Sequence, residues 1–147
     1  MDQTLKHKIF SFTKKPLIIA VLLFVFTLIE IYWAMGSFSD KISSGCLDCS
    51  FFDDAYLMTL FSTVFLSIVF LALSFIKNSN LKAILQLLIL ITVWFFWNYT
   101  IFVDRESAWS TYLFKEEIMY TFKFSFLPIS ILSIVTVFSL NYISRKL

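Results

Sequence analysis

The sequence predicts an all-α integral membrane protein in which four transmembrane helices form an antiparallel bundle. Of the 147 residues, 59% are hydrophobic and 20% are aromatic, whereas soluble domains are usually about 45–50% apolar. The apolar residues are concentrated in four long segments, and these segments with their short connections occupy the whole chain. We therefore expect a single domain, residues 1–147, without a separate soluble part.

Each segment is long enough to cross a membrane. The spans are expected at residues 16–36, 55–76, 83–103 and 118–143. About 20 apolar residues in a helix cross the ~30 Å of bilayer hydrocarbon, and the backbone amides there must be hydrogen-bonded within their own segment. The first segment is longer than the roughly 7–15 apolar residues of a signal-peptide core, so we expect it to be retained as a helix.

Charged residues are distributed unequally between the two ends of the predicted bundle. The N-terminal tail, the 77–82 turn and the C-terminal tail carry a net charge of +7, and the opposite end carries −5. Because loops rich in Lys and Arg stay in the cytoplasm, both termini are expected inside. The loops 37–54 and 104–117 are then periplasmic or extracellular, and the expected location is the inner (cytoplasmic) membrane of a bacterium.

Small and polar residues recur along the spans at helical spacing and are expected to form the inner seam of the bundle, because helices associate in lipid through close packing and interhelical hydrogen bonds. They are Ala20, Thr27, Glu30 and Ala34 in the first span, Tyr56, Thr59, Thr63, Ser67 and Ser74 in the second, Gln86, Trp97 and Thr100 in the third, and Ser130 and Ser133 in the fourth. Glu30 is the one ionisable residue well inside a span. It is expected to be a structural carboxyl bonded to Thr27 or to the second helix, with a functional role as the alternative.

The aromatic run WFFWNY, residues 94–99, lies in the outer part of the third span. It is expected to form a belt at headgroup depth, and Trp94, Trp97 and Tyr99 are candidates for a surface that holds a flat apolar ligand. In the loop that follows, Trp109, Tyr112 and Leu113 share one helical face. This pattern predicts a short helix lying on the membrane surface before the fourth span.

Both cysteines, Cys46 and Cys49, lie in the stretch SSGCLDCSFFDD on the predicted outer side, where disulfides persist. We expect a structural disulfide that tightens the turn into the second span, with Asp53 or Asp54 capping that helix. The neighbouring aspartates disfavour a reactive thiolate. Two free thiols, or a zinc site completed by two of the three nearby aspartates, are the alternatives.

A four-helix membrane protein with C-x-x-C in its first outer loop resembles the quinone-reducing disulfide-bond formation proteins of the DsbB type. The resemblance covers the topology and this one motif, and it implies a thiol–quinone oxidoreductase that uses Cys46 and Cys49 with a quinone. That family usually has a second cysteine pair in its second outer loop and an arginine shortly after the first pair. Here residues 104–121 contain no cysteine, and the motif is followed by SFFDD.

Other chemistry has little support in the sequence. There is no Gly-rich phosphate loop, and the single histidine, His7, lies across the membrane from both cysteines. A Cys–His metal or nucleophile site is therefore not expected, and neither is a cofactor. The basic tails are read as topology determinants rather than as a nucleic-acid site.

The leading hypothesis is non-enzymatic: a small inner-membrane protein that acts through protein–protein contacts in the membrane. Its partner would be another membrane protein, a periplasmic protein or a second copy of itself. It would serve as an accessory subunit, or in the manner of the immunity proteins of pore-forming colicins, which it resembles in size and topology. A small transporter ranks third, because the spans lack glycine breaks and paired prolines.

Overall fold

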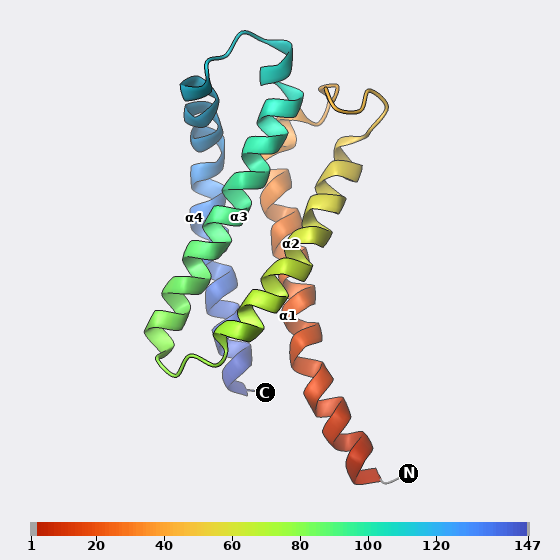
Figure 1. Ribbon diagram of the computed structural model, residues 1–147, viewed down its shortest axis with the longest axis vertical. Helices are drawn as coiled ribbons and strands as arrows, with labels where there is room; N and C mark the ends of the chain where they lie inside the picture. The colour runs from red at the N-terminus through yellow and green to blue at the C-terminus, as the bar shows by residue number, and fades with distance from the viewer. Residues whose placement is uncertain (1–2, 147) are drawn as a thin grey trace.

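The computed structural model describes residues 3–146, with the side chains of residues 16–143. Four long helices pack antiparallel, and α1 begins at the same end of the bundle at which α4 ends (Figure 1). The helices are α1 (Gln3–Met35), α2 (Phe51–Leu73), α3 (Ser79–Arg105) and α4 (Phe114–Lys146). Each is long and apolar enough to cross a membrane. The predicted fold class is confirmed, and the chain is a multi-pass membrane protein by the composition of its helices.

The end of the bundle that carries residues 36–50 and 106–113 is called the outer end below. Two short 3-10 helices lie there, η1 (Gly36–Phe38) after α1 and η2 (Ser107–Trp109) after α3. The surface helix predicted from the spacing of Trp109, Tyr112 and Leu113 is present only as η2, because Tyr112 and Leu113 lie in the irregular segment beyond it. Tyr112 instead packs its ring on Phe102 and Tyr120.

Polar caps set where α2 and α3 begin, and both helices begin four residues before the expected apolar spans, at Phe51 and Ser79. The Ser50 hydroxyl accepts from the backbone N–H of Asp53 at 3.1 Å. The Asp53 carboxylate in return accepts from the backbone N–H and the hydroxyl of Ser50. This reciprocal capping box satisfies amides that the first helical turn leaves unpaired. Asn78 caps α3 without such a reciprocal bond, as its side-chain oxygen accepts from the backbone N–H groups of Asn80 and Leu81. Asp53 therefore stabilises the start of α2 as expected, but from the third helical position, with Ser50 as the N-cap.

The buried apolar side chains form two separate clusters. The outer cluster comprises Ile31, Ala34, Met35, Phe38, Phe51, Ala55, Ile101 and Phe102. The inner cluster comprises Leu23, Leu66, Phe70, Leu90, Trp94, Ile129, Leu132, Val137 and Leu140. In α1, α2 and α3, the sequence passes from one cluster to the other through a short stretch of buried polar residues, and α4 buries two polar residues at the corresponding level. We call these residues the polar layer: Thr27, Glu30, Thr59, Ser62, Thr63, Asn98, Thr121 and Ser125.

The predicted inner seam lies partly in this core. Thr27, Glu30, Ala34, Thr59, Thr63, Gln86 and Ser133 are buried, and Ala20, Ser67, Trp97, Thr100 and Ser130 are half-buried. Two residues assigned to the seam are exposed instead. Tyr56 lies near the outer end of α2, where its ring stacks on Phe52 and meets the edge of Phe24. Ser74 ends α2, and its hydroxyl donates to the Leu71 carbonyl of its own helix.

Candidate functional site

Two hydrogen bonds across the bundle hold α1 to α3 in the polar layer. Asn98 Nδ2 donates to Glu30 Oε1 at 2.7 Å, and both residues are fully buried. One turn toward the inner cluster, the indole N–H of Trp94 donates to Thr27 Oγ1 at 3.0 Å. The partner predicted for Glu30 was Thr27 or a residue of the second helix. That prediction is wrong, because α3 supplies the donor and Thr27 is already bonded to Trp94.

The remaining polar atoms of this layer are sparsely paired. Within the described residues, buried oxygens without a hydrogen-bond partner come from all four helices at this level. They are Glu30 Oε2, Asn98 Oδ1 and the hydroxyls of Thr59, Ser62, Thr63, Thr121 and Ser125. Native proteins leave few buried polar atoms unpaired, and such atoms mark places where water or a ligand binds. The polar layer is therefore the first candidate site.

The three aromatic candidates of α3 do not form one surface. Trp94 is completely buried in the inner cluster. Trp97 is half-buried beside α2, and the Tyr99 hydroxyl donates to Glu117 Oε2 of α4 at 2.9 Å. The belt prediction is thus wrong for Trp94, because the helical period turns this residue to the bundle interior. Trp97 lines a cavity between α2 and α3.

Arg105, the last residue of α3, anchors the outer end. Its side chain is only 2% exposed and donates to the carbonyl of Lys41 and, at 3.4 Å, to that of Cys49. It also forms an ion pair with Asp54 at 2.6 Å, and its guanidinium lies over the Phe51 ring. One arginine thus fastens α3 to the first outer loop and to the start of α2, because its five donors satisfy several acceptors at once.

The residues beside Arg105 extend this connection. The Asp104 carboxylate accepts from the Ser44 hydroxyl at 2.8 Å and from the Gly45 N–H at 2.9 Å. The Ser44 N–H donates to the Asp104 carbonyl at 3.1 Å. Two consecutive residues of α3, Asp104 and Arg105, therefore both bind the first outer loop.

Two further contacts join the outer loops nearer the surface. Lys41 forms an ion pair with Glu106 at 2.6 Å, and the Trp109 indole donates to the Ile42 carbonyl at 2.9 Å. Together with Arg105 and Asp104, they hold residues 39–50 and 104–113 as one unit, which we call the outer cap. It is the second candidate site.

The two cysteines lie in this cap, with their sulfur atoms at disulfide distance, 2.03 Å apart. The Cys49 N–H also donates to the Cys46 carbonyl at 3.2 Å, so the backbone closes the same turn. Of the nearby aspartates, Asp53 is bound in the capping box and Asp54 is paired with Arg105. Across the residues that the structure describes, no group of three His, Cys, Asp or Glu side chains is placed to hold a metal ion.

The cysteine pair and the membrane-embedded aromatic residues lie at different depths. Cys49 precedes the first residue of α2, whereas Trp97 is at the level of Ser62 in the middle of that helix. At 1.5 Å per residue, this separates the two by about 16 Å along the bundle. The structure therefore does not bring Cys46 and Cys49 together with the aromatic side chains that a thiol–quinone reaction would need beside them.

We expect the cysteine bond to contribute only modestly to stability. Replacing both residues in a Cys46→Ser/Cys49→Ser variant should lower the free energy of unfolding by about 1–2 kcal/mol, because the closed loop is very short. The measurement is unfolding in mixed detergent micelles, followed by circular dichroism and compared with the oxidised wild type. A loss above about 4 kcal/mol would show that the bond, and not the contacts of Arg105, holds the cap.

Comparison of the chain with protein-family models, curated proteins and solved structures finds no match. The fold and the composition of the helices thus define a class, a four-helix multi-pass membrane protein. Its two candidate sites are the polar layer and the outer cap.

Proposed function

We propose that this chain is a non-enzymatic membrane protein that works by binding another protein through its outer cap. The observation that carries the proposal is the cap's combination of fixed loops and exposed apolar side chains. Ile42, Leu47, Trp109 and Leu113 are each more than half exposed and lie outside the four long helices, Trp109 at the end of η2. Contiguous exposed apolar surface marks interaction sites in proteins, and Ile42 and Trp109 line one groove of the cap.

A groove next to these side chains supports the same role. It has a volume of about 400 Å³ and is lined by Asp40, Lys41, Ile42, Arg105, Glu106, Trp109 and Ser110. Charged and apolar groups therefore alternate on one small surface, an arrangement that suits a protein partner with both apolar anchors and polar contacts. Because the loops are already held together, little ordering entropy is lost on binding.

The proposal includes an orientation. In the inner membrane of a bacterium, the charge pattern favours an orientation with the outer cap on the periplasmic or extracellular side. In this orientation the cap meets periplasmic proteins and the exposed parts of membrane proteins, as either an accessory subunit or an immunity-type protein would require. Alkaline phosphatase fused after Ser44 should be active, and the same enzyme fused after Asn78 inactive. The reverse activities would contradict the orientation.

The binding role is tested by co-purification from membranes of the source cells with a tagged chain. A Leu47→Asp/Leu113→Asp variant should lose the proteins that the wild type retains, because charges replace both apolar contacts. Phe75→Asp is the matched control, since it makes the same kind of change at an 87% exposed residue of the opposite end. Each retained protein is then purified and rebound to the chain. Equal recovery with the cap variant and the wild type would exclude the cap as the binding surface.

A further inference from the structure

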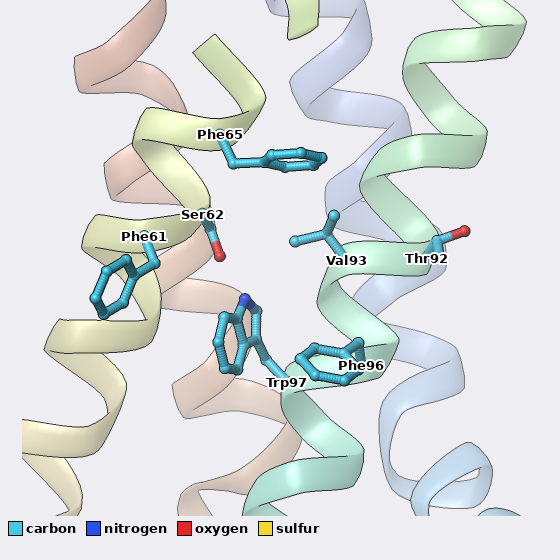
Figure 2. Close-up of a pocket in the computed structure, with 7 residues that line it drawn as sticks. All are labelled: Phe61, Ser62, Phe65, Thr92, Val93, Phe96 and Trp97. Carbon is cyan, nitrogen blue, oxygen red and sulfur yellow. The ribbon is translucent and has the colours of Figure 1, made fainter. Parts of the chain in front are cut away.

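A cavity opens between α2 and α3 in the middle of the membrane span. It has a volume of about 420 Å³ and is lined by Phe61, Ser62, Phe65, Thr92, Val93, Phe96 and Trp97. Figure 2 shows the rings of Phe61 and Phe65 on α2 and of Phe96 and Trp97 on α3, on the two sides of the opening. Since Phe61, Phe65 and Phe96 are each more than half exposed on the outside of the bundle, the cavity faces the lipid.

Ser62 connects this cavity to the polar layer. Its side chain is 2% exposed, and within the described chain its hydroxyl has no hydrogen-bond partner. In Figure 2 this hydroxyl is turned toward the space between the helices, and the indole nitrogen of Trp97 is turned toward the same space. The Thr92 hydroxyl, by contrast, points away and donates to the Leu88 carbonyl of its own helix at 2.8 Å. The otherwise apolar cavity therefore has one place, at the Ser62 hydroxyl, where a ligand can form a hydrogen bond.

We propose that the cavity between α2 and α3 binds a flat, uncharged, membrane-dissolved molecule that accepts a hydrogen bond through a carbonyl oxygen. The aromatic walls suit a planar ring, since rings pack against one another in stacked or edge-on geometry. The buried, unpaired Ser62 hydroxyl is the donor for the carbonyl, and the Trp97 ring is one of the aromatic walls. Ligand cavities typically measure about 300–1,000 Å³ and combine apolar walls with a few placed polar groups.

Other occupants fit these observations less well. A lipid acyl chain carries no polar atom at this depth and leaves the Ser62 hydroxyl unpaired, which is costly in hydrocarbon. A helix of a partner protein is about 10–12 Å wide, so the cavity holds about one of its turns at most. A small molecule that enters from the lipid fits the volume of the cavity, and its carbonyl oxygen gives the Ser62 hydroxyl an acceptor.

The experiment uses the full-length protein in lipid nanodiscs and two probes that differ in one group. 2-Acetylnaphthalene carries a carbonyl on a flat ring system, and 2-ethylnaphthalene lacks the oxygen. Saturable quenching of tryptophan fluorescence reports binding, and Trp97→Phe should reduce its amplitude. We expect the carbonyl probe to bind at least about fivefold more tightly, the effect of one hydrogen bond.

Two matched variants locate the hydrogen bond. Ser62→Ala should reduce the preference for the carbonyl probe to less than about twofold, because it removes the donor. Thr92→Val lines the same cavity but loses a hydroxyl that is already bonded within its helix, so it should leave the preference unchanged. Val93→Phe, an apolar exchange, should abolish saturable binding of both probes by filling the space.

Several results would overturn the proposal. One is quenching that rises linearly with both probes, which is simple partition into the bilayer. Another is an unchanged carbonyl preference in Ser62→Ala. A third is quenching by lipids with brominated acyl chains that the carbonyl probe does not relieve, which would assign the cavity to lipid.

Discussion

Replacing Arg105 with methionine is expected to lower the free energy of unfolding by about 3 kcal/mol, the largest effect of any single substitution in the outer cap. The change leaves the Asp54 carboxylate without its cation and two loop carbonyls without their donor. It also removes the guanidinium from the Phe51 ring. Titration with sodium dodecyl sulfate in mixed micelles, followed by circular dichroism, measures the loss. Arg105→Lys should recover only part of it, since an ammonium cannot reach all of these acceptors.

The matched control for this prediction is Lys41→Met. It also removes one basic side chain and one ion pair from the cap, but that pair is exposed, with the Lys41 side chain 52% accessible. Exposed pairs contribute at most about 1 kcal/mol, and the Lys41 carbonyl that accepts from Arg105 is retained in this variant. If both variants lost the same stability, Arg105 would not be the anchor of the cap.

The second large effect is expected in the polar layer. Asn98→Leu should destabilise the bundle by about 2 kcal/mol, because it removes the donor to Glu30 and leaves a buried carboxyl oxygen unpaired. Replacing both partners, in Glu30→Leu/Asn98→Leu, should restore part of the loss, since the buried Glu30 carboxyl is then removed together with its donor. The same detergent titration compares the three proteins.

Thr100→Val serves as the control for Asn98→Leu. The Thr100 hydroxyl bonds back to the Phe96 carbonyl of its own helix at 3.0 Å, so its removal should cost less than about 0.5 kcal/mol. If the double variant proved less stable than Asn98→Leu alone, the packing of these side chains and not their hydrogen bond would dominate.

The four helices could be predicted from the sequence because length and apolarity decide which segments cross a membrane. The side chains that bond to one another across the bundle were not predicted from it. By its position in the sequence, Arg105 falls in the predicted loop 104–117 and Asn98 in the aromatic run 94–99, yet both lie on a buried stripe of α3. That stripe also includes Gln86, Leu90 and Trp94. Its spacing of three or four residues was present in the sequence and could have indicated both residues.

The cap could not have been predicted in the same way. The contacts of Asp104 with Ser44 and of Arg105 with Lys41 join residues about 60 apart in the chain. No local pattern encodes such a pairing, which depends on how α1 and α3 pack. The cavity likewise requires the spacing between α2 and α3, so the phenylalanines that line it could not be told from other lipid-facing residues.

We propose that the outer surface of the cap, and not cysteine chemistry, carries the function. The deciding experiment measures binding of the partner identified by co-purification to two variants side by side. Cys46→Ser/Cys49→Ser is expected to bind this partner within about threefold of the wild type, while Leu47→Asp/Leu113→Asp should lose binding by at least about 30-fold, the loss of two interface anchors. Loss of binding in the cysteine variant, with binding retained by the Leu47→Asp/Leu113→Asp variant, would contradict it.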